Sequence, residues 1–349
     1  MNNIERFKAV MGFQPFDRLP LVEWAPWWKL TIERWREEGL PNEVETVQDI
    51  QRYFGLDIYR QTVIRCQGWD CPRPEAHGMG IIQNEEDYER ILPTLYPWPQ
   101  YQEPDGWPVV DAEHWKRLAD SQASGEEVTW LTLDGFFWLP RTLLGIERHL
   151  YAFYEQPDLM HRICQDLADW QLRVIEEVSK YCTPAFMTFA EDMSYNHGPM
   201  LSEDLFNEFM KPYYHQVVPA VKEMGTLAII DSDGDITRAV PWFKDAGLDG
   251  ILPIERQAGT DISAIRKDYP HMRFIGCFDK MCMDKGEAAM RAEFERLLPV
   301  AAQGGLIISC DHQTPPAVSI EDYRLYVELF KEYAEKAGEM SRERENTQA

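Results

Sequence analysis

The sequence predicts an α/β fold, a single-domain (β/α)8 TIM barrel that spans residues 1–349. Five short apolar segments in the second half alternate with helical segments. Such alternation indicates a parallel sheet, because neighbouring parallel strands need a crossover connection. Three further strand candidates bring the count to eight, and the length suits one large domain of this kind.

An open doubly wound sheet is the alternative architecture. Such sheets often carry a glycine-rich nucleotide site. The chain has no G-x-G-x-x-G after the first strand and no G-x-x-x-x-G-K-[ST] motif, so dinucleotide and P-loop functions lose support.

The first part of the chain, residues 1–125, is irregular. Proline and tryptophan recur together in the segments 24–28 and 95–99, and the stretch 84–120 is polar and aromatic with many prolines. We expect helices broken by long loops here. The early strand candidates are 19–24, 58–65 and 128–133.

The second part, residues 126–337, carries the regular barrel repeats. Apolar residues recur every three or four positions from Leu159 to Val178, which is the pattern of an amphipathic helix. The run 185–190 is short, apolar and aromatic, as in a buried strand. Further helices are expected at about 202–223, 236–245, 261–267, 285–302 and 320–337, and further strands at 227–230, 250–254, 273–277 and 305–309. The polar tail, 338–349, is expected to fray.

The composition excludes several classes of protein. There are 59 acidic and 35 basic residues, which gives a formal net charge of -24. The hydrophobic fraction of 44% is too high for a disordered chain, and no apolar run approaches the roughly 20 residues of a membrane span. Net acidity argues against nucleic-acid or membrane partners. Seven scattered cysteines and the absence of a signal-peptide pattern indicate reduced thiols in a cytoplasmic protein.

Ionisable residues follow nearly every predicted strand of the second half. In (β/α) barrels the carboxyl ends of the strands carry the active site. The alternative is that such residues cap the helices that follow, a role that suits Asp235 and Asp261. The residues expected around the mouth are Glu191, Asp192, Asp231, Asp233, Glu255, Asp279, Lys280, Cys310, Asp311 and His312.

Crowded carboxylates can serve acid-base chemistry or hold a cation. Like charges raise one another's pKa, which suits proton transfer near neutral pH. Hard cations prefer oxygen ligands, whereas zinc prefers Cys and His with some Asp. Asp231, Asp233, Cys310 and His312 could together make a zinc site. Tyr195 and Asn196 lie in a loop that could close over the mouth, and Trp24 could line an apolar pocket there.

The order and spacing of several segments resemble the uroporphyrinogen decarboxylase superfamily over about the whole chain. These segments are 17–20 (DRLP), 189–194 (FAEDMS), 198–202 (GPMLS), 231–235 (DSDGD), 249–255 (DGILPIE), 304–305 (GG) and 310–316 (CDHQTPP) with Tyr323. The resemblance implies a (β/α)8 barrel, often a homodimer, with one of two chemistries. One is cofactor-free decarboxylation of uroporphyrinogen. The other is methyl transfer from a corrinoid to a thiol such as coenzyme M, with zinc activating the thiol.

The sequence departs from both branches of that superfamily. Decarboxylases carry an Arg-rich stretch, R-Q-A-G-R, after the first strand, where arginines would hold substrate carboxylates. Here the segment 23–28 contains no Arg. The methyltransferases carry H-x-C and a later Cys as zinc ligands. Here Asp231 and Asp233 stand at the first two positions, and Cys310 alone matches the later Cys.

These observations lead to the hypothesis of a methyltransferase-type enzyme in one-carbon or demethylation metabolism, with a corrinoid protein as partner. Decarboxylation of uroporphyrinogen or another carboxylic acid, and tetrapyrrole binding without catalysis, are the alternatives. Zinc is a candidate cofactor, and homodimerisation is expected from the resemblance and the surplus of aromatics. The residues expected to act in catalysis are Glu191, Asp192, Glu255 and His312, those in substrate binding are Trp24, Tyr195, Asn196, Asp279, Lys280 and Asp311, and those on the metal are Asp231, Asp233 and Cys310.

Overall fold

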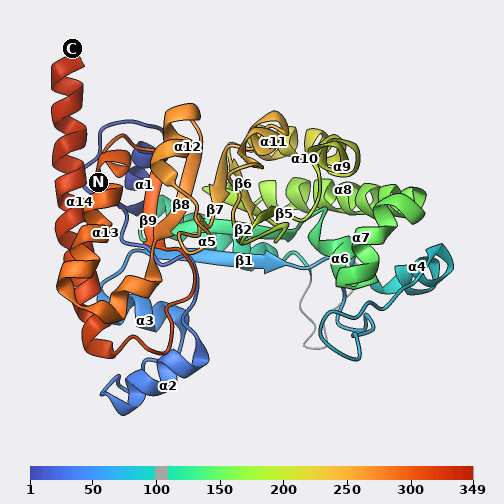
Figure 1. The fold of residues 1–349 in the computed structure, drawn as a ribbon, viewed down its shortest axis with the longest axis horizontal. Helices are drawn as coiled ribbons and strands as arrows, with labels where there is room; N and C mark the ends of the chain where they lie inside the picture. Colours follow the sequence, from blue (N-terminus) through green and yellow to red (C-terminus); the bar gives the residue numbers. More distant parts are fainter. Residues whose placement is uncertain (99–108, 349) are drawn as a thin grey trace.

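The computed structural model describes residues 1–98 and 109–348. Its main sheet has seven parallel strands in sequence order, curled into a half-barrel with helices packed around it (Figure 1). Each strand lies within two residues of its predicted limits. The strands are β1 (Ile58–Ile64), β2 (Glu127–Asp134), β3 (Phe186–Ala190), β6 (Leu227–Asp231), β7 (Gly250–Leu252), β8 (Arg273–Phe278) and β9 (Leu306–Cys310).

The predicted strand at 19–24 is wrong, and the structure does not show a closed ring of eight strands. The segment reaches the start of β1, where Asp57 N donates to Leu21 O at 2.8 Å. Beyond this contact, hydrogen bonds to side-chain carboxylates replace the backbone hydrogen bonds of a strand ladder. Leu21 N donates to the carboxylate of Asp57 at 2.9 Å, and Cys310 N at the end of β9 donates to the carboxylate of Glu23 at 3.1 Å.

The helices alternate with the strands as expected from the sequence. They are α1 (Asn3–Met11), α2 (Lys29–Glu37), α3 (Val47–Phe54), α4 (Glu85–Ile91), α5 (Ala112–Ser124), α6 (Trp138–Leu144), α7 (Ile146–Glu155), α8 (Pro157–Ser179), α9 (Glu203–Phe209), α10 (Lys211–Glu223), α11 (Val240–Asp245), α12 (Ile262–Asp268), α13 (Glu287–Ala301) and α14 (Ile320–Gln348), with short 3-10 helices η1 (Leu92–Thr94) and η2 (Lys280–Lys285). The part of the loop-rich stretch at 99–108 lies outside the described residues.

The helix predicted from the stripe Leu159 to Val178 is confirmed as α8, and both of these residues are buried. The helix predicted at 202–223 is instead two helices, α9 and α10. They meet at Met210, whose φ and ψ of -124° and -50° are not helical. Pro212 in the first turn of α10 supplies the reason, because it lacks the N–H that a continuous helix would donate to Glu208 O.

The expectation of a frayed tail is also wrong, since α14 continues to Gln348. The polar extension packs against the chain near residue 17. Arg342 donates to the backbone oxygens of Phe16 and Asp17 at 2.8 and 2.9 Å. A Cβ at Gly338 would lie 2.0 Å from Asp17 O, so the close approach requires glycine there. Within the described residues, no helix combines the length and apolar character that a membrane crossing requires.

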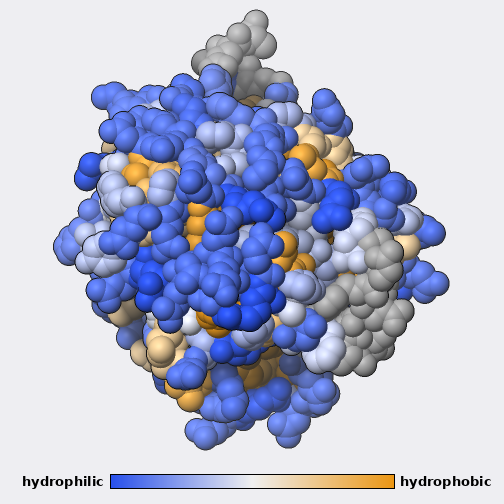
Figure 2. All heavy atoms as spheres, turned by 90° about the vertical axis from the view of Figure 1, so that its right-hand side faces the viewer, coloured by the Kyte–Doolittle hydropathy of each residue, from blue (hydrophilic) through white to orange (hydrophobic). Residues whose placement is uncertain are grey.

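Helix α1 covers the end of the sheet at which the strands begin. Phe7 stacks on Phe186 of β3 with ring centroids 5.5 Å apart, and Gly305 N, just before β9, donates to Val10 O at 2.6 Å. The opposite end, where the strands finish, faces α6 and α7 (Figure 1). Chemistry in folds of this kind is built on that second end. Seen from the α4, α6 and α7 side, the surface is largely hydrophilic with small separate apolar patches (Figure 2).

Candidate functional site

Three carboxylates meet where β3 and β6 end, and we call them the carboxylate group. Asp192, Asp231 and Asp233 each place one side-chain oxygen within 4.8 Å of the others. Backbone bonds produce this convergence, because Glu191 N and Asp192 N both donate to Asp231 O, at 2.8 and 3.3 Å. Asp192 adopts a left-handed backbone with φ of +45°, which turns the chain sharply after β3.

Two members of the carboxylate group, Asp192 and Asp231, hold their protons more tightly than ordinary aspartates do. Burial, together with the charge of Asp233, raises the pKa of Asp192 to about 6. Burial and the neighbouring carboxylates raise the pKa of Asp231 well above its usual value. Arg141 and Arg65 oppose these shifts in Asp192 and Asp231 respectively. The raised pKa of Asp192 brings its proton exchange close to the range that general acid-base chemistry uses.

His312 lies beside the carboxylate group, as the sequence predicted. Its Nε2 is 3.5 Å from Asp233 Oδ2, and this contact raises the pKa of the imidazole. The indole of Trp24 meets the His312 ring edge-to-face, with centroids 5.7 Å apart. Trp24 is fixed there because its Nε1 donates to Cys310 O at 2.8 Å. An aromatic wall and an ionisable pair thus stand side by side.

A second charged cluster, Glu255, Lys280 and Asp311, lies at the ends of β7, β8 and β9. Lys280 Nζ is 3.6 Å from Asp311 Oδ1 and 4.0 Å from Glu255 Oε1. Asp311 is fully buried, which raises its pKa to about 6. Glu255 accepts from Gly234 N at 2.8 Å, so it ties this cluster to the loop that carries Asp233.

Some of the predicted mouth residues hold the fold instead of facing an open site. Glu191 is fully buried, and its carboxylate accepts from the backbone N–H groups of Phe136, Phe137 and Trp138 and from the hydroxyl of Tyr214. Burial raises its pKa to about 7. Asp279 caps η2 by accepting from Met281 N. Asp261 caps α12, as the alternative interpretation proposed.

Tyr195 and Asn196 lie at the turn of a two-stranded hairpin, β4 (Ser194–Tyr195) and β5 (Gly198–Pro199). Tyr195 is half exposed, at 50%. The hairpin is seated on the loop after β6. Asp235 N donates to Tyr195 O at 3.0 Å, and a Cβ at Gly234 would lie only 2.6 Å from Tyr195 N. The hairpin backbone thus packs on the loop that carries Asp233, and the Tyr195 side chain stays exposed.

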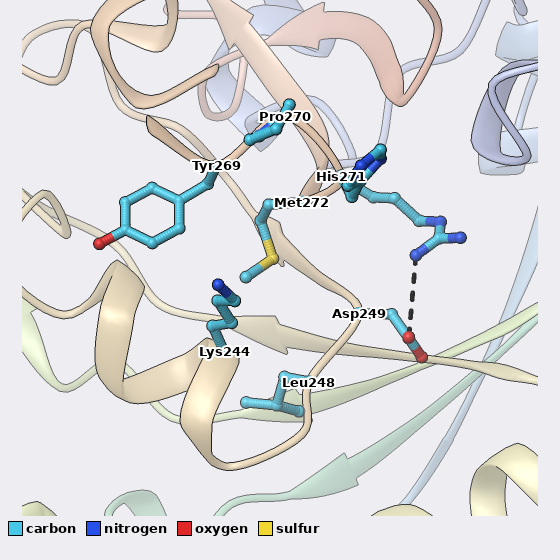
Figure 3. Close-up of a pocket in the computed structure, with 8 residues that line it drawn as sticks. Lys244, Leu248, Asp249, Tyr269, Pro270, His271 and Met272 are labelled. Atoms are coloured by element: carbon cyan, nitrogen blue, oxygen red, sulfur yellow. Dashed lines mark ion pairs between the residues drawn. The ribbon is translucent and has the colours of Figure 1, made fainter. Parts of the chain in front are cut away.

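A separate hollow of about 170 Å³ lies at the other end of the strands (Figure 3). Its lining includes Asp249, which precedes β7, and Arg273, which begins β8. These two residues form an ion pair of 3.7 Å. Because the hollow lies where strands begin, it is remote from the ends at which barrel enzymes place their chemistry.

A comparison with protein families identifies the family to which this chain belongs. The uroporphyrinogen decarboxylase (URO-D) family model matches residues 135–333, more than half of the sequence. The chain belongs to the uroporphyrinogen decarboxylase family. The matched stretch contains the carboxylate group and His312. No curated protein gives a significant sequence match.

Solved structures with a similar fold were also found. A methyltransferase from Methanosarcina mazei matches over 95% of this chain and 99% of its own, with a TM-score of 0.63 and 14% identity. A structure of L-ribulose 3-epimerase matches over 82% of this chain and 97% of its own, with a TM-score of 0.40 and 11% identity. The first match shows a shared fold.

The metal set predicted for this family member is not assembled as expected. Within the described residues, the carboxylate group is the only cluster whose side chains could jointly hold an ion, and Cys310 is not in it. The Cys310 thiol is buried and contacts Met283 Sδ at 3.5 Å, and burial raises its pKa well above the usual value. Asp192 takes the place beside Asp231 and Asp233 that the prediction gave to Cys310. Three oxygen ligands suit a hard cation such as Mg²⁺, and the thiolate-zinc set does not fit.

Sequence reasoning missed two arginines near the carboxylate group. Arg65 directly follows β1 and forms an ion pair of 2.7 Å with Asp134, so the strand-end rule could have found it. Arg141 donates from Nη1 to Asp192 O at 3.1 Å. It lies within α6, and no local pattern marks it. Together they place positive charge around an acidic mouth that lacks the family's Arg-rich stretch.

Proposed function

We propose that this member of the uroporphyrinogen decarboxylase family is a methyltransferase of one-carbon or demethylation metabolism that uses a corrinoid protein as methyl donor. The observation that carries the proposal is the convergence of the carboxylate group with His312 and Trp24 beside it. The fold likeness to a Methanosarcina methyltransferase supports it. So do the lack of arginine in 23–28 and a net charge of -24, which disfavour an octa-anionic porphyrinogen.

The chemistry assigned to these residues is deprotonation of a methyl acceptor. The acceptor X–H gives its proton to His312 or to an ionised carboxylate of the group. The freed electron pair of X forms the new bond to the methyl carbon. The bond from that carbon to the donor breaks, and its electron pair stays on the donor. Asp192, whose pKa is raised to about 6, and His312, whose pKa is raised by Asp233, suit such a transfer.

A divalent cation with oxygen ligands is compatible with this assignment. Asp192, Asp231 and Asp233 would hold it. When bound, such a cation would neutralise the carboxylates and lower the pKa of an acceptor beside it. His312 would then remain as the proton carrier, held by its contact with Asp233. Trp24 would exclude water on one side.

The test uses the full chain with methylcobalamin as the donor and a panel of thiols, amines and phenols as acceptors. Loss of the cobalt–methyl absorbance together with a methylated acceptor is the expected result. His312→Gln should lower the rate strongly, and Asp268→Asn, at an exposed position at the end of α12, should not. No turnover with any acceptor would contradict the proposal.

Decarboxylation is the second candidate, and one specific observation favours it. Loss of CO₂ leaves a carbanion that needs a proton, and the raised pKa values of Asp192 and Asp231 keep such protons available. Conversion of uroporphyrinogen to coproporphyrinogen by the pure protein, without methyl transfer, would establish this candidate. Tight binding of a tetrapyrrole without turnover would instead favour a binding role.

A further inference from the structure

A second hollow, of about 260 Å³, lies between the loop after β1 and the helices α6 and α7. We call it the α6–α7 pocket. The lining residues used below are Arg73, His77, Met79, Trp138, Arg141 and Ile146. Its volume lies just below the range of about 300–1,000 Å³ typical of drug-sized ligand pockets, so it suits a small molecule and not a tetrapyrrole.

The lining of the α6–α7 pocket has the opposite charge to the protein as a whole. Among the described residues that line it are Arg73, Arg141 and His77, and none of these lining residues is acidic, although the chain carries a net charge of -24. Among the ion pairs of the described residues, neither arginine takes part in one. An arginine facing a hollow without a carboxylate partner keeps its forked donors free for an anion.

Arg141 is held in place by contacts that leave donors unused. Its Nη1 donates to Asp192 O at 3.1 Å, and its guanidinium lies over the Trp138 ring at 5.3 Å from the centroid. A guanidinium has five N–H donors. The contact with Asp192 also joins the pocket to the carboxylate group. A ligand that reached Arg141 would therefore lie next to the proposed reacting groups.

The pocket wall is fixed by backbone contacts between two distant segments. Ile146 N donates to Gly78 O at 3.0 Å, and Ile81 N donates to Leu143 O at 2.7 Å. A Cβ at Gly80 would lie 2.2 Å from the backbone of Leu144, so the segments touch too closely for any other residue. Such a wall is formed before a ligand arrives, which lowers the cost of binding.

Apolar groups complete the lining. Met79 is 50% exposed, and Trp138 and Ile146 are partly exposed. They flank the arginines, so a ligand would meet a cationic end and an apolar end. This combination recognises an amphipathic acid, since a carboxylate pairs with a guanidinium and an apolar body packs on Trp and Met.

We propose that the α6–α7 pocket binds a small organic carboxylic acid with an aromatic or short apolar body, its carboxylate on Arg141 and Arg73. The further assignment of this acid as the methyl acceptor rests on the proposed function. Trp138 and Met79 hold the apolar body.

Direct binding tests the proposal without requiring turnover. Isothermal titration calorimetry of the full chain uses benzoate, phenylacetate and hexanoate as probes, and benzyl alcohol and benzylamine as neutral and cationic counterparts. We expect the acids to bind and the counterparts to bind at least about tenfold more weakly, because a charge-assisted pair is lost. Equal affinity for acids and counterparts, or no binding of any acid, would overturn it.

Variants locate the site. Arg73→Gln removes an exposed side chain and should preserve folding, while Arg141→Gln tests the inner position. Each should weaken the binding of the best acid about tenfold. Arg117→Gln is the matched control, since Arg117 is exposed on α5 and does not line the pocket. Unchanged affinity in Arg73→Gln and Arg141→Gln would overturn the assignment. Acid binding without methyl transfer would overturn the proposed function alone, and methyl transfer without acid binding would overturn this inference alone.

Discussion

The imidazole Nε2 of His312 lies 3.5 Å from a carboxylate oxygen of Asp233, and the two residues come from the ends of β9 and β6. The contact gives the site a histidine that keeps its proton to a higher pH than a free imidazole. It also links the carboxylate group to the aromatic wall that Trp24 provides.

Replacing Asp233 by Asn should lower the pKa of His312, because the contact that favours the imidazolium is removed. Nuclear magnetic resonance titration of chelator-treated protein measures the value, and His312→Gln assigns the resonance. Asp268→Asn, at an exposed position, serves as the control and should leave the curve unchanged. A His312 pKa that does not fall in Asp233→Asn would contradict the role given to this contact.

Replacing Asp192 by Asn should stabilise the protein at alkaline pH. The pKa of Asp192 is about 6 in the fold and near 3.8 when unfolded, so the unfolded chain ionises first. The free energy of unfolding therefore falls as pH rises between those values and stays lower above them. Asn removes this loss and tolerates the left-handed backbone of position 192.

Urea unfolding at pH 4 and pH 8 measures the effect. We expect Asp192→Asn to gain about 1 kcal/mol over the wild type at pH 8 relative to pH 4, less than the full shift because the residue is only half buried. Asp268→Asn should show no such difference. Equal pH dependence in Asp192→Asn and the wild type would count against a raised pKa.

A hard divalent cation should bind the carboxylate group independently of the cysteine. We expect Mg²⁺ or Mn²⁺ to raise the melting temperature of the wild type, Asp231→Asn to lose that response and Cys310→Ala to retain it. Differential scanning calorimetry with and without the ion checks all three. Zinc that binds tightly to the wild type and is lost in Cys310→Ala would contradict this prediction. It would show that the thiolate of Cys310 is a zinc ligand, which the geometry disfavours.

Glu191→Gln should destabilise the fold by about 2–4 kcal/mol, because an amide turns a donor toward backbone N–H groups that the carboxylate now satisfies. Tyr214→Phe removes one hydroxyl partner and should cost about 1 kcal/mol. Equilibrium denaturation provides both values, and Glu176→Gln on the exposed side of α8 is the control. A Glu191→Gln variant of normal stability and no activity would return Glu191 to a catalytic role.

Much of the fold followed from local patterns. Short apolar runs predicted seven strands because burial on both faces of a parallel sheet leaves few polar positions, and β2 is buried throughout. The segment 19–24 carries the same apolar character. It fails as a strand because Asp57 and Glu23 supply the bonds that a ladder would need, and such long-range side-chain substitution leaves no trace in local sequence.

The position of the site along the chain was predictable, but the side to which individual side chains point was less so. The strand-end rule placed Asp231 and His312 at the mouth. It could not tell which face Cys310 takes, and the thiol lies against Met283 instead. Arg141 could not be found, since its approach to Asp192 depends on how α6 folds back over the strand ends.

The hydrogen bonds between the segment 19–24 and β9 affect the candidate site. A strand ladder would join the segment to β9 by several backbone hydrogen bonds. Here the carboxylate of Glu23 instead accepts from both the hydroxyl of Ser309 and the N–H of Cys310. Trp24 adds two further bonds to β9, from its backbone N to Ser309 Oγ at 3.1 Å and from its Nε1 to Cys310 O at 2.8 Å. The half-barrel is thus joined at this edge by two adjacent residues, Glu23 and Trp24. The same residues that join this edge of the sheet therefore also set the position of the Trp24 ring beside His312.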